Sequence, residues 1–305
     1  MAILAICGPT ASGKSALADR LAQELHTDVI SCDSMQVYRG MDIGTAKTPR
    51  EERLVPLHLV DVVDVTEGYS AALYQCDARQ QIDAELAQGM VPILCGGTGL
   101  YLRAALDEMD FPSGHYDGEH RKQYQDLLER RGEASLYALL VERDPASADL
   151  IHPHNTRRVI RALEMLDEGV SYAQQHAGFS EYREHYPNVY RFALTMDRAR
   201  LYRRIDQRVD DMIARGLIQE VQTLVAQGAA DAITAMQAIG YKEILDVFQG
   251  TLSRDEAIDL IKRRSRRYAK RQLSWFRRDR RFHWIDLDQY DLDGAVTLIR
   301  SIAGM

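Results

Sequence analysis

The chain has 305 residues, of which 46% are hydrophobic and 27% charged, and its formal net charge is −7. This composition is ordinary for a soluble globular protein, and the length allows one large domain or two with a substantial core. No apolar run approaches the roughly 20 residues of a membrane-spanning helix, so a transmembrane protein is excluded. The first apolar segment has no basic stretch before it and is expected to be a strand rather than a signal peptide.

The first predicted elements enclose a phosphate-binding loop. Residues 2–7 are apolar on both faces, as in a central parallel strand, and residues 15–25 carry leucines at helical spacing. Residues 8–15 link them and read GPTASGKS, a complete G-x-x-x-x-G-K-[ST] motif. In this strand–turn–helix context the backbone N–H groups are expected to surround a phosphate chain, with Lys14 as a point charge and Ser15 on Mg²⁺.

Further strand patterns alternate with helical ones. The predicted strands cover residues 28–32, 57–63, 91–95, 189–196 and 282–287, and a helix is predicted over residues 71–88. This alternation predicts an α/β fold with a doubly wound parallel sheet, similar to P-loop NTPases, in which ligands bind at the carboxyl ends of the strands.

The middle of the chain has a different pattern. Residues 111–187 show polar helical patterns and no strand signal, which predicts an α-helical insertion domain. Residues 1–110 and 188–305 are expected to form the P-loop core, together with a helical region over residues 198–281 and a terminal helix.

Two polar residues follow predicted strands and face the same crevice as the phosphate loop. Asp33 comes directly after the second strand and is a candidate general base or metal ligand, although an Asp-Ser pair is equally suited to capping a turn. Thr98 lies in a second glycine-rich turn, GGTG at residues 96–99, where glycines let a ligand approach the backbone. The alternative for Thr98 is a plain glycine turn.

Three basic residues are further candidates for holding an anion. Arg204 and Arg208 are one helical turn apart and share a face after the 189–196 strand, although a surface ion pair with nearby aspartates is the alternative. Lys47 follows a glycine-containing loop and is predicted to be a solvated loop lysine rather than a phosphate ligand.

Basic residues gather in two segments. Residues 262–281 contain eleven Lys and Arg against one acid, interleaved with aromatic residues, which favours a surface that binds single-stranded or looped RNA over a merely solvated face. Eleven positive charges beside one acid are expected to repel one another without a polyanionic partner. Residues 157–161 are predicted to begin a helix whose arginines contact a nucleic-acid backbone.

Several strings together resemble the tRNA dimethylallyltransferase family, also called tRNA isopentenyltransferase, in its bacterial form. They occur in the family's order and span nearly the whole chain. The matching segments are residues 8–15, SCDSMQVYRGMDIGTAK at 31–47, GGTGLY at 96–101, RVIRALE at 158–164, AIGYKE at 238–243 and AKRQLSWFR at 269–277.

The resemblance implies transfer of a dimethylallyl group from its diphosphate to N6 of adenosine 37 in tRNA, with Mg²⁺ as cofactor and release of diphosphate. Asp33, Thr98 and Arg208 are implied as catalytic, Asp33 accepting a proton from the amine or orienting it. The residues implied to hold the diphosphate are Gly8, Thr10, Ala11, Ser12, Gly13, Lys14, Ser15 and Arg204, with Ser15 as the metal ligand.

The resemblance also implies a set of residues that contact the tRNA anticodon stem-loop. They are Asp33, Ser34, Met35, Gln36, Arg157, Arg158, Val159, Ile160, Arg161, Gln237, Ala238, Ile239, Gly240, Tyr241, Lys242, Lys270, Arg271, Gln272, Trp275 and Arg277.

The remaining expectations concern the cellular compartment, the oligomeric state and the alternative functions. The four cysteines show no C-x-x-C pairing, which indicates a reducing cytoplasm, and a monomer with no membrane contact is expected. The rival functions are a P-loop kinase of a small metabolite or nucleoside, which leaves the basic segment without a purpose, and an RNA-binding NTPase, for which no Walker-B strand is evident.

Overall fold

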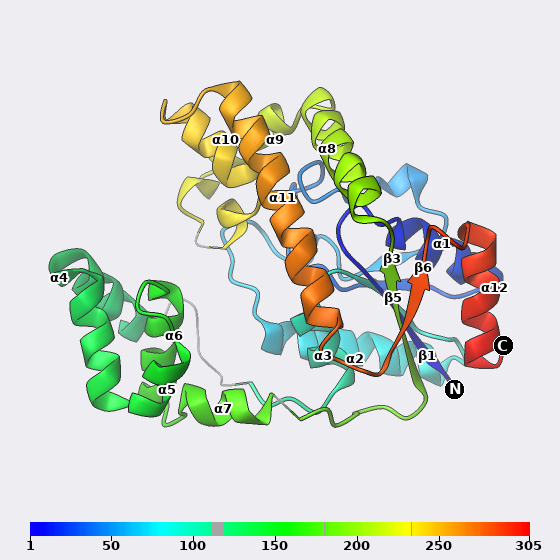
Figure 1. Ribbon diagram of the computed structural model, residues 1–305, viewed down its shortest axis with the longest axis horizontal. Helices are drawn as coiled ribbons and strands as arrows, with labels where there is room; N and C mark the ends of the chain where they lie inside the picture. Colours follow the sequence, from blue (N-terminus) through cyan, green and yellow to red (C-terminus); the bar gives the residue numbers. More distant parts are fainter. Residues whose placement is uncertain (112–118, 180, 233) are drawn as a thin grey trace. The chain divides into compact units, whose positions relative to one another are not determined.

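The computed structural model describes residues 1–305 except 112–118, 180 and 233 (Figure 1). It divides into two compact units, one formed by residues 1–106 and 186–305 and the other by residues 107–185. The expected insertion over 111–187 therefore overlaps the second unit, which begins four residues and ends two residues earlier in the chain. None of the described helices combines the length and hydrophobicity that crossing a bilayer requires.

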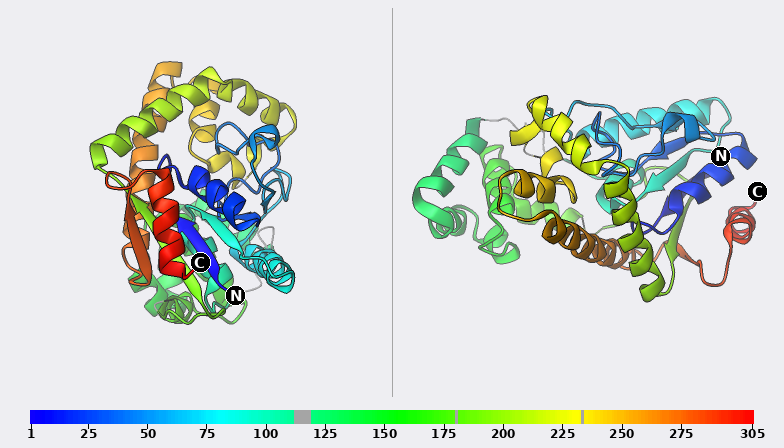
Figure 2. Two further views of the ribbon diagram at one scale, coloured as in Figure 1. Left: turned by 90° about the vertical axis from the view of Figure 1, so that its right-hand side faces the viewer. Right: turned by 90° about the horizontal axis from the view of Figure 1, so that it is seen from above.

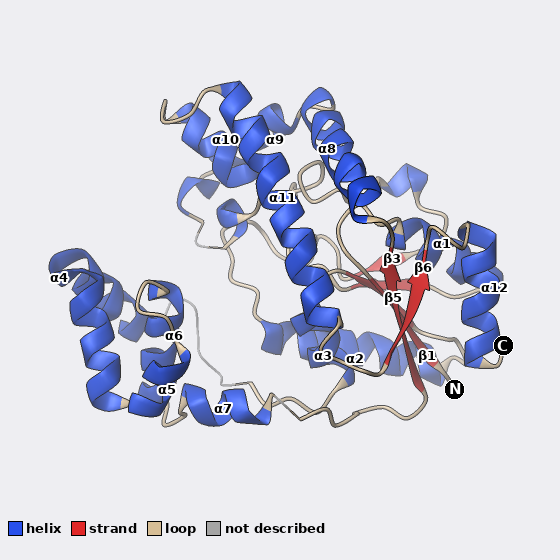
Figure 3. Ribbon diagram, in the orientation of Figure 1, coloured by secondary structure: helices blue, strands red, loops and turns tan. Residues whose placement is uncertain are grey.

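The first unit is built on one six-stranded sheet in the order β3-β2-β4-β1-β5-β6, and every pairing is parallel (Figure 3). This confirms the predicted α/β fold. The parallel arrangement brings the carboxyl ends of β1, β2, β4 and β5 to the same edge. The strands are β1 (Ile3–Cys7), β2 (Val29–Ser31), β3 (Leu57–His58), β4 (Ile93–Gly96), β5 (Val189–Thr195) and β6 (Phe282–Asp286).

The strand predicted over residues 57–63 is mostly wrong, because β3 ends at His58. Leu59 and Asp61 have φ values of 57° and 56°, in the left-handed region that a strand does not contain. The chain beyond them pairs with an earlier loop instead: Val62 N donates to Val37 O at 2.7 Å. The apolar residues after His58 therefore continue as a loop that is hydrogen-bonded to the loop after β2, and not as a longer strand.

Helices cover the sheet of the first unit. The helices α1 (Lys14–Leu25) and α12 (Leu292–Ala303) lie side by side and share an apolar cluster with Leu4, Ile6 and Phe192 of the sheet (Figures 1 and 2). The helix α2 (Ala71–Ala87) packs on α3 (Gly99–Leu106).

The C-terminal helices of the first unit pack around α11 (Arg254–Phe276), which contains most of the basic segment. Its neighbours are α3, α8 (Arg198–Ala214) and α10 (Tyr241–Phe248), and α9 (Leu217–Ala226) packs on α8 and α10. Three short 3₁₀ helices complete this unit: η1 (Arg50–Glu52), η2 (Ala229–Asp231) and η3 (Ala235–Gln237).

The second unit is helical throughout its described residues, with α4 (Glu119–Arg143), α5 (Pro145–Leu150), α6 (Thr156–Asp167) and α7 (Tyr172–Gly178). Leu136 and Leu140 of α4 pack with Val159 and Leu163 of α6 in its core. Arg121 fixes the same two helices through a two-point ion pair with Glu164 at 2.7 and 2.8 Å.

Candidate active site

The phosphate loop forms an anion-binding turn at the start of α1. Ala11 has a φ of 62° and Gly13, the residue before the helix, has a φ of 99°, so backbone N–H groups point inward rather than into a strand ladder. No side chain caps α1 and no acid occupies its first turn. The Ser12 hydroxyl is buried and has no hydrogen-bond partner in the described structure. These groups are the donors that a bound phosphate would satisfy.

A cleft of about 590 Å³ lies against this loop. Its charged side chains are four cations and one acid, so it favours an anionic ligand. The lining residues are Ala11, Gly13, Lys14, Ser15, Ala16, Ala46, Thr48, Arg203, Arg204, Gln207, Arg208 and Asp211.

Arg204 and Arg208 of α8 both line the cleft beside the phosphate loop. This agrees with the prediction that they share one face of their helix. Arg204 Nε donates to the carbonyl of Ala11 at 2.8 Å, which fixes the strained part of the loop. Burial lowers the pKa of Lys14, and the nearby Arg208 lowers it further. Burial likewise lowers the pKa of Arg208, with Arg204 acting in the same direction. Arg208 therefore repels both Lys14 and Arg204, and an anion bound in the cleft would relieve this repulsion.

Asp33 lies across from these cations. Its charge raises the pKa of Lys14 and of Arg208, against the effect of burial, which places the carboxylate within electrostatic reach of both. One carboxylate oxygen, Oδ1, accepts from Met35 N at 2.9 Å. The turn-capping role, which the sequence offered as the alternative to a general base or metal ligand, is thus present, and the carboxylate also lies near the phosphate loop.

Thr98 joins the second glycine turn to the turn that carries Asp33. Its Oγ1 accepts from Ser34 N at 3.1 Å, and its own N–H donates to Cys32 O at 3.1 Å. The two turns follow β2 and β4, which are neighbours in the sheet. Neither Asp33 nor Thr98 lines the cleft itself, so the site has a cationic part and, beside it, a smaller polar part.

The glycines of the second turn serve packing against α11. A Cβ on Gly97 would lie 2.1 Å from Gln272 Nε2, and one on Gly99 would lie 2.1 Å from Trp275 Cδ1. In this structure side chains of α11 fill the space that these two glycines leave open.

Gln272 is buried and ties the two glycine turns together. Its Oε1 accepts from Thr10 N at 2.9 Å and its Nε2 donates to Gly97 O at 2.9 Å. The carbonyl and the amide of the side chain are both engaged and the side chain is buried, so Gln272 positions the phosphate loop.

Replacing Gln272 with Met, which keeps the side-chain volume, is expected to lower the free energy of unfolding by about 1–3 kcal/mol, because it leaves a buried N–H and a buried carbonyl unpaired. Chemical denaturation measures the change. Gln222→Met, at an exposed position of α9, is the matched control and is expected to change little. Equal stabilities of the two variants would contradict the role given to Gln272.

Tyr268 is a site residue that the sequence did not single out. Burial, followed by the charge of Asp33, raises the pKa of its hydroxyl, and the neighbouring Thr98 and Gln272 side chains lower it. Tyr268 lies one turn before Gln272 on α11, so helical spacing placed the two on one face. In the sequence it was grouped with aromatic residues expected to stack on RNA.

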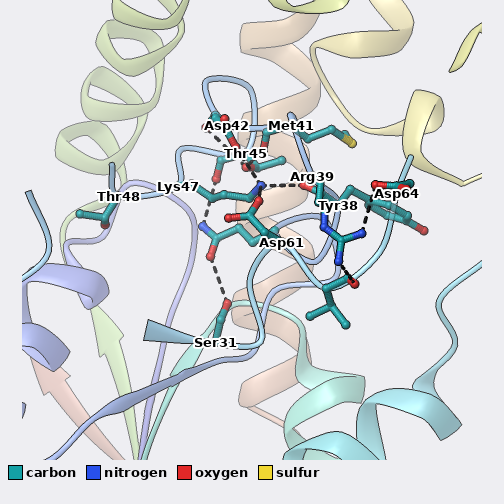
Figure 4. Close-up of polar contacts among 12 residues, drawn as sticks. Ser31, Tyr38, Arg39, Met41, Asp42, Thr45, Lys47, Thr48, Asp61 and Asp64 are labelled. Carbon is teal, nitrogen blue, oxygen red and sulfur yellow. Dashed lines mark hydrogen bonds and ion pairs between the residues drawn. The ribbon is translucent and has the colours of Figure 1, made fainter. Parts of the chain in front are cut away.

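Lys47 is buried, and the prediction of a solvated loop lysine is wrong (Figure 4). Its ammonium group donates to Tyr38 O at 2.6 Å, to Asp42 Oδ1 at 2.8 Å and to Asp61 Oδ1 at 2.5 Å. These three bonds use every donor of the ammonium group, so Lys47 closes the loop between β2 and β3 and is not a phosphate ligand.

Glu220 anchors the same loop from α9. Its carboxylate accepts the backbone N–H groups of residues 42–44 at 3.0, 2.7 and 3.1 Å and the Tyr241 hydroxyl at 2.6 Å. A Cβ on Gly44 would lie 2.4 Å from the Tyr241 ring, so only glycine allows this approach. The AIGYKE string thus serves the fold of the loop next to the site.

Several residues predicted to contact tRNA are buried. The side chains of Gln272, Val159, Ile160 and Tyr241 are buried and are used in packing or internal hydrogen bonds. They are not available for direct contact with RNA in this conformation. Gly240 is buried as well and has no side chain to offer. Apolar positions within a basic string, here on α6, face the core because the helix is amphipathic.

The basic segment is less self-repelling than its sequence suggested, because neighbouring elements supply acids. Four of its cations form ion pairs, namely Lys262 with Asp210, Arg264 with Glu243, Arg266 with Asp206 and Arg281 with Asp279. The other seven are exposed and form no ion pair with a described residue: Arg263, Arg267, Lys270, Arg271, Arg277, Arg278 and Arg280. These seven form the exposed basic surface of this segment.

The predicted site residues therefore lie in both units. The phosphate loop, Arg204, Arg208, Asp33 and Thr98 come together at the carboxyl ends of β1, β2 and β4. Arg157, Arg158 and Arg161 belong to the second unit, where Arg157 and Arg158 are exposed on α6.

Comparison with known proteins gives one consistent family. A family model described as IPP transferase matches residues 36–279. A tRNA dimethylallyltransferase of Carboxydothermus hydrogenoformans is 44% identical over 307 residues, covering 99% of this chain and 97% of the relative. Another, of Geobacillus kaustophilus, is 46% identical over 287 residues, covering 93% of this chain and 90% of the relative.

Solved structures that resemble this chain belong to the same family. A tRNA isopentenylpyrophosphate transferase of Bacillus halodurans has a TM-score of 0.73 and 42% identity, covering 99% of this chain and 96% of that one. A eukaryotic dimethylallyltransferase described as acting on tRNA has a TM-score of 0.78 and 30% identity, covering 99% of this chain and 78% of that one.

Proposed function

The chain belongs to the IPP transferase family of tRNA dimethylallyltransferases, and from this premise we propose that the cleft beside its phosphate loop holds the diphosphate of dimethylallyl diphosphate. As a member of this family it is a tRNA prenyltransferase rather than a kinase. The observation that carries the proposal is the convergence of Lys14, Arg204 and Arg208 in one cleft at an uncapped helix N-terminus, with the charge of Asp33 acting on two of them.

The cationic part of the site suits a diphosphate leaving group. When the bond between the allylic carbon and the diphosphate oxygen breaks, negative charge grows on that oxygen. Lys14, Arg204, Arg208 and the loop N–H groups are fixed around the place where it grows, so they stabilise the transition state more than the ground state. Their mutual repulsion in the free protein makes neutralisation by a diphosphate more favourable still.

The residues around Ser15 fit Mg²⁺ held mainly through substrate. Ser15 is exposed in the cleft on the first turn of α1, and Asp211 is the carboxylate in the lining. Mg²⁺ typically keeps several waters and binds through one or two protein oxygens plus phosphate oxygens, which this sparse donor set allows. When bound, the ion would add positive charge at the leaving diphosphate.

The polar part of the site suits the acceptor amine. We propose that N6 of adenosine 37 attacks the allylic carbon, forming the N–C bond as the C–O bond to diphosphate breaks. The amine proton passes to Asp33, and the products are N6-isopentenyladenosine and diphosphate. Thr98 is proposed to hydrogen-bond the amine or the departing oxygen, and its bond from Ser34 N supports this by holding its hydroxyl beside the Asp33 turn.

The tRNA must present its base outside the stack, because an adenine inside a stacked anticodon arm cannot reach a recessed carbon. Ser34, Met35 and Gln36 are partly exposed beside Asp33 and are proposed to contact the flipped nucleotide. The exposed basic surface of α11 is proposed to hold the phosphate backbone. The remaining predicted contacts that stay available are Arg157, Arg158, Arg161, Gln237, Ala238, Ile239, Lys242 and Trp275.

A double variant, Arg271→Ala with Arg277→Ala, is expected to weaken tRNA binding. The slope of log binding constant against log salt concentration is expected to become shallower by roughly 1.4–1.8, because each lost phosphate contact reduces it by about 0.7–0.9. Filter binding over a salt series measures this slope. Arg20→Ala with Arg300→Ala removes the same charge from α1 and α12 and serves as the control. An unchanged slope in the Arg271/Arg277 variant would show that the RNA surface lies elsewhere.

The experiment that tests the ligand assignment is a binding competition in the presence of Mg²⁺. Inorganic diphosphate and a non-reactive thio analogue of dimethylallyl diphosphate are expected to compete for one site, with ATP a weaker competitor. Binding of ATP in preference to the prenyl analogue would contradict the proposal. We also expect the enzyme to act as a monomer in the cytoplasm, and light scattering of the purified protein tests the oligomeric state.

A further inference from the structure

A cluster of three possible metal ligands lies at the sheet edge formed by β2 and β3. Asp28 directly precedes β2, His58 ends β3 and Glu85 lies in the last turn of α2. One ligand atom from each lies within 4.8 Å of the other two, and His58 Nε2 is 2.8 Å from Asp28 Oδ2. We call these three residues the edge cluster. Asp28 stands at the amino end of its strand, whereas the phosphate loop follows the carboxyl end of β1, so the cluster is separate from the proposed active site.

Glu85 is the unusual member of the cluster. The residue is 1% exposed, and its Oε1 accepts from Gln81 Nε2 at 2.9 Å. Its Oε2 is buried and has no hydrogen-bond partner in the described structure. A buried carboxylate oxygen without a partner is costly, and native proteins nearly always satisfy such atoms.

A proton, a water or a cation could satisfy Glu85 Oε2. Burial raises the pKa of Glu85, which favours protonation, while the neighbouring His58 lowers it. A proton on Oε2, or a water beside it, would satisfy the oxygen without affecting the second carboxylate, Asp28. A cation would satisfy Oε2 and would also balance the second carboxylate, Asp28.

We propose that the edge cluster binds a divalent transition-metal ion of the Zn²⁺ class through His58 Nε2 and one carboxylate oxygen each from Asp28 and Glu85. One imidazole nitrogen with two carboxylate oxygens suits Zn²⁺, whereas Mg²⁺ and Ca²⁺ prefer oxygen ligands alone. Ligands about 2.0–2.2 Å from the metal stand roughly 3.3–3.5 Å apart in a tetrahedron, so rotamer shifts of about 1 Å assemble the site.

The surroundings of the cluster fit this role. The side chains of His58 and Asp28 are 32% and 24% exposed, which leaves an entry path and room for a water as fourth ligand. Gln81 orients Glu85 from the opposite side, as outer partners of metal ligands commonly do. The bound ion would connect β2, the two-residue strand β3 and α2, so it would stabilise this edge of the sheet without entering the transfer reaction.

The test uses the full chain stripped of metal with a chelator, in excess Mg²⁺ so that oxygen-only sites are occupied. Titration with Co²⁺ is expected to give visible d–d absorption at one equivalent, and Zn²⁺ is expected to displace it and to raise the melting temperature. His58→Gln is expected to abolish the absorption, and Glu85→Gln to weaken binding at least about tenfold. Neither variant is expected to change the rate of prenyl transfer at saturating substrate.

His154→Gln is the matched control, because His154 also pairs with a carboxylate, Glu133 at 2.7 Å, on the exposed surface and has no third ligand. Binding that survives His58→Gln, or that His154→Gln removes equally, would overturn the proposal. The proposal would also be overturned if the wild type binds no Co²⁺ and the metal-free Glu85→Gln variant is more stable than the wild type. Glu85 would then be protonated rather than a metal ligand. His58 is partly exposed, so its variant carries the test even if Glu85→Gln does not fold.

Discussion

Asp33→Asn is expected to lower the single-turnover rate of prenyl transfer by roughly 10²–10⁴-fold, the usual contribution of a positioned general base. The amide cannot take the amine proton. Its carbonyl oxygen can still accept from Met35 N, as Asp33 Oδ1 does at 2.9 Å, so the turn and the affinity for dimethylallyl diphosphate are expected to persist. Rapid-quench measurement with excess enzyme isolates the chemical step from product release.

A second variant separates the two possible roles of Asp33. If Asp33 only orients the amine, Asn retains an acceptor and loses little rate, while Asp33→Ala loses much more. If Asp33 takes the proton, both variants lose rate to a similar extent. Asp64→Asn, an exposed aspartate paired with Arg39 on the neighbouring loop, is the control. An unchanged rate in Asp33→Asn and Asp33→Ala would eliminate both roles.

Lys14→Met is expected to lower the transfer rate by roughly 10²–10³-fold, as removal of one preorganised charge at a leaving group commonly does. Its effect on stability should have the opposite sign. Burial and Arg208 lower the pKa of Lys14, so its charge is less favourable in the folded, ligand-free protein than in the unfolded chain. The ligand-free variant is therefore expected to unfold at the same temperature as the wild type or a higher one.

Diphosphate with Mg²⁺ should then distinguish the two proteins. It is expected to raise the melting temperature of the wild type and to raise that of Lys14→Met much less. Arg215→Met is the control, because Arg215 is an exposed residue that follows α8 and does not line the cleft. A Lys14 variant that is both destabilised without ligand and normally stabilised by diphosphate would show that Lys14 has a structural role instead.

Local patterns were sufficient to predict the sheet and the phosphate loop, because both depend on short-range signals. A buried strand reads as a continuous apolar run, and the loop motif fixes backbone geometry within eight residues. The parallel sheet then brings Asp33 and Thr98 together, since their turns follow neighbouring strands. Helical spacing likewise placed Arg204 and Arg208 on one face.

The roles of Lys47, Gln272 and Tyr268 depend on distant segments and were not predictable from local patterns. Lys47 is buried because Asp61, fourteen residues away, supplies a second carboxylate. Gln272 reaches Thr10 across 262 residues of sequence. The basic segment looked unbalanced because its counter-charges lie on α8 and α10. In each case the partner becomes visible only when the chain is folded.

The central claim is that the phosphate loop serves a prenyl diphosphate and an RNA acceptor. The most direct measurement offers the purified protein an unmodified tRNA transcript, Mg²⁺, and either dimethylallyl diphosphate labelled in the prenyl group or γ-labelled ATP. Label from the prenyl donor is expected to enter the tRNA and to be recovered as N6-isopentenyladenosine from position 37, with none incorporated when that position is changed to guanosine. Consumption of ATP without prenyl transfer would contradict the assignment of the site.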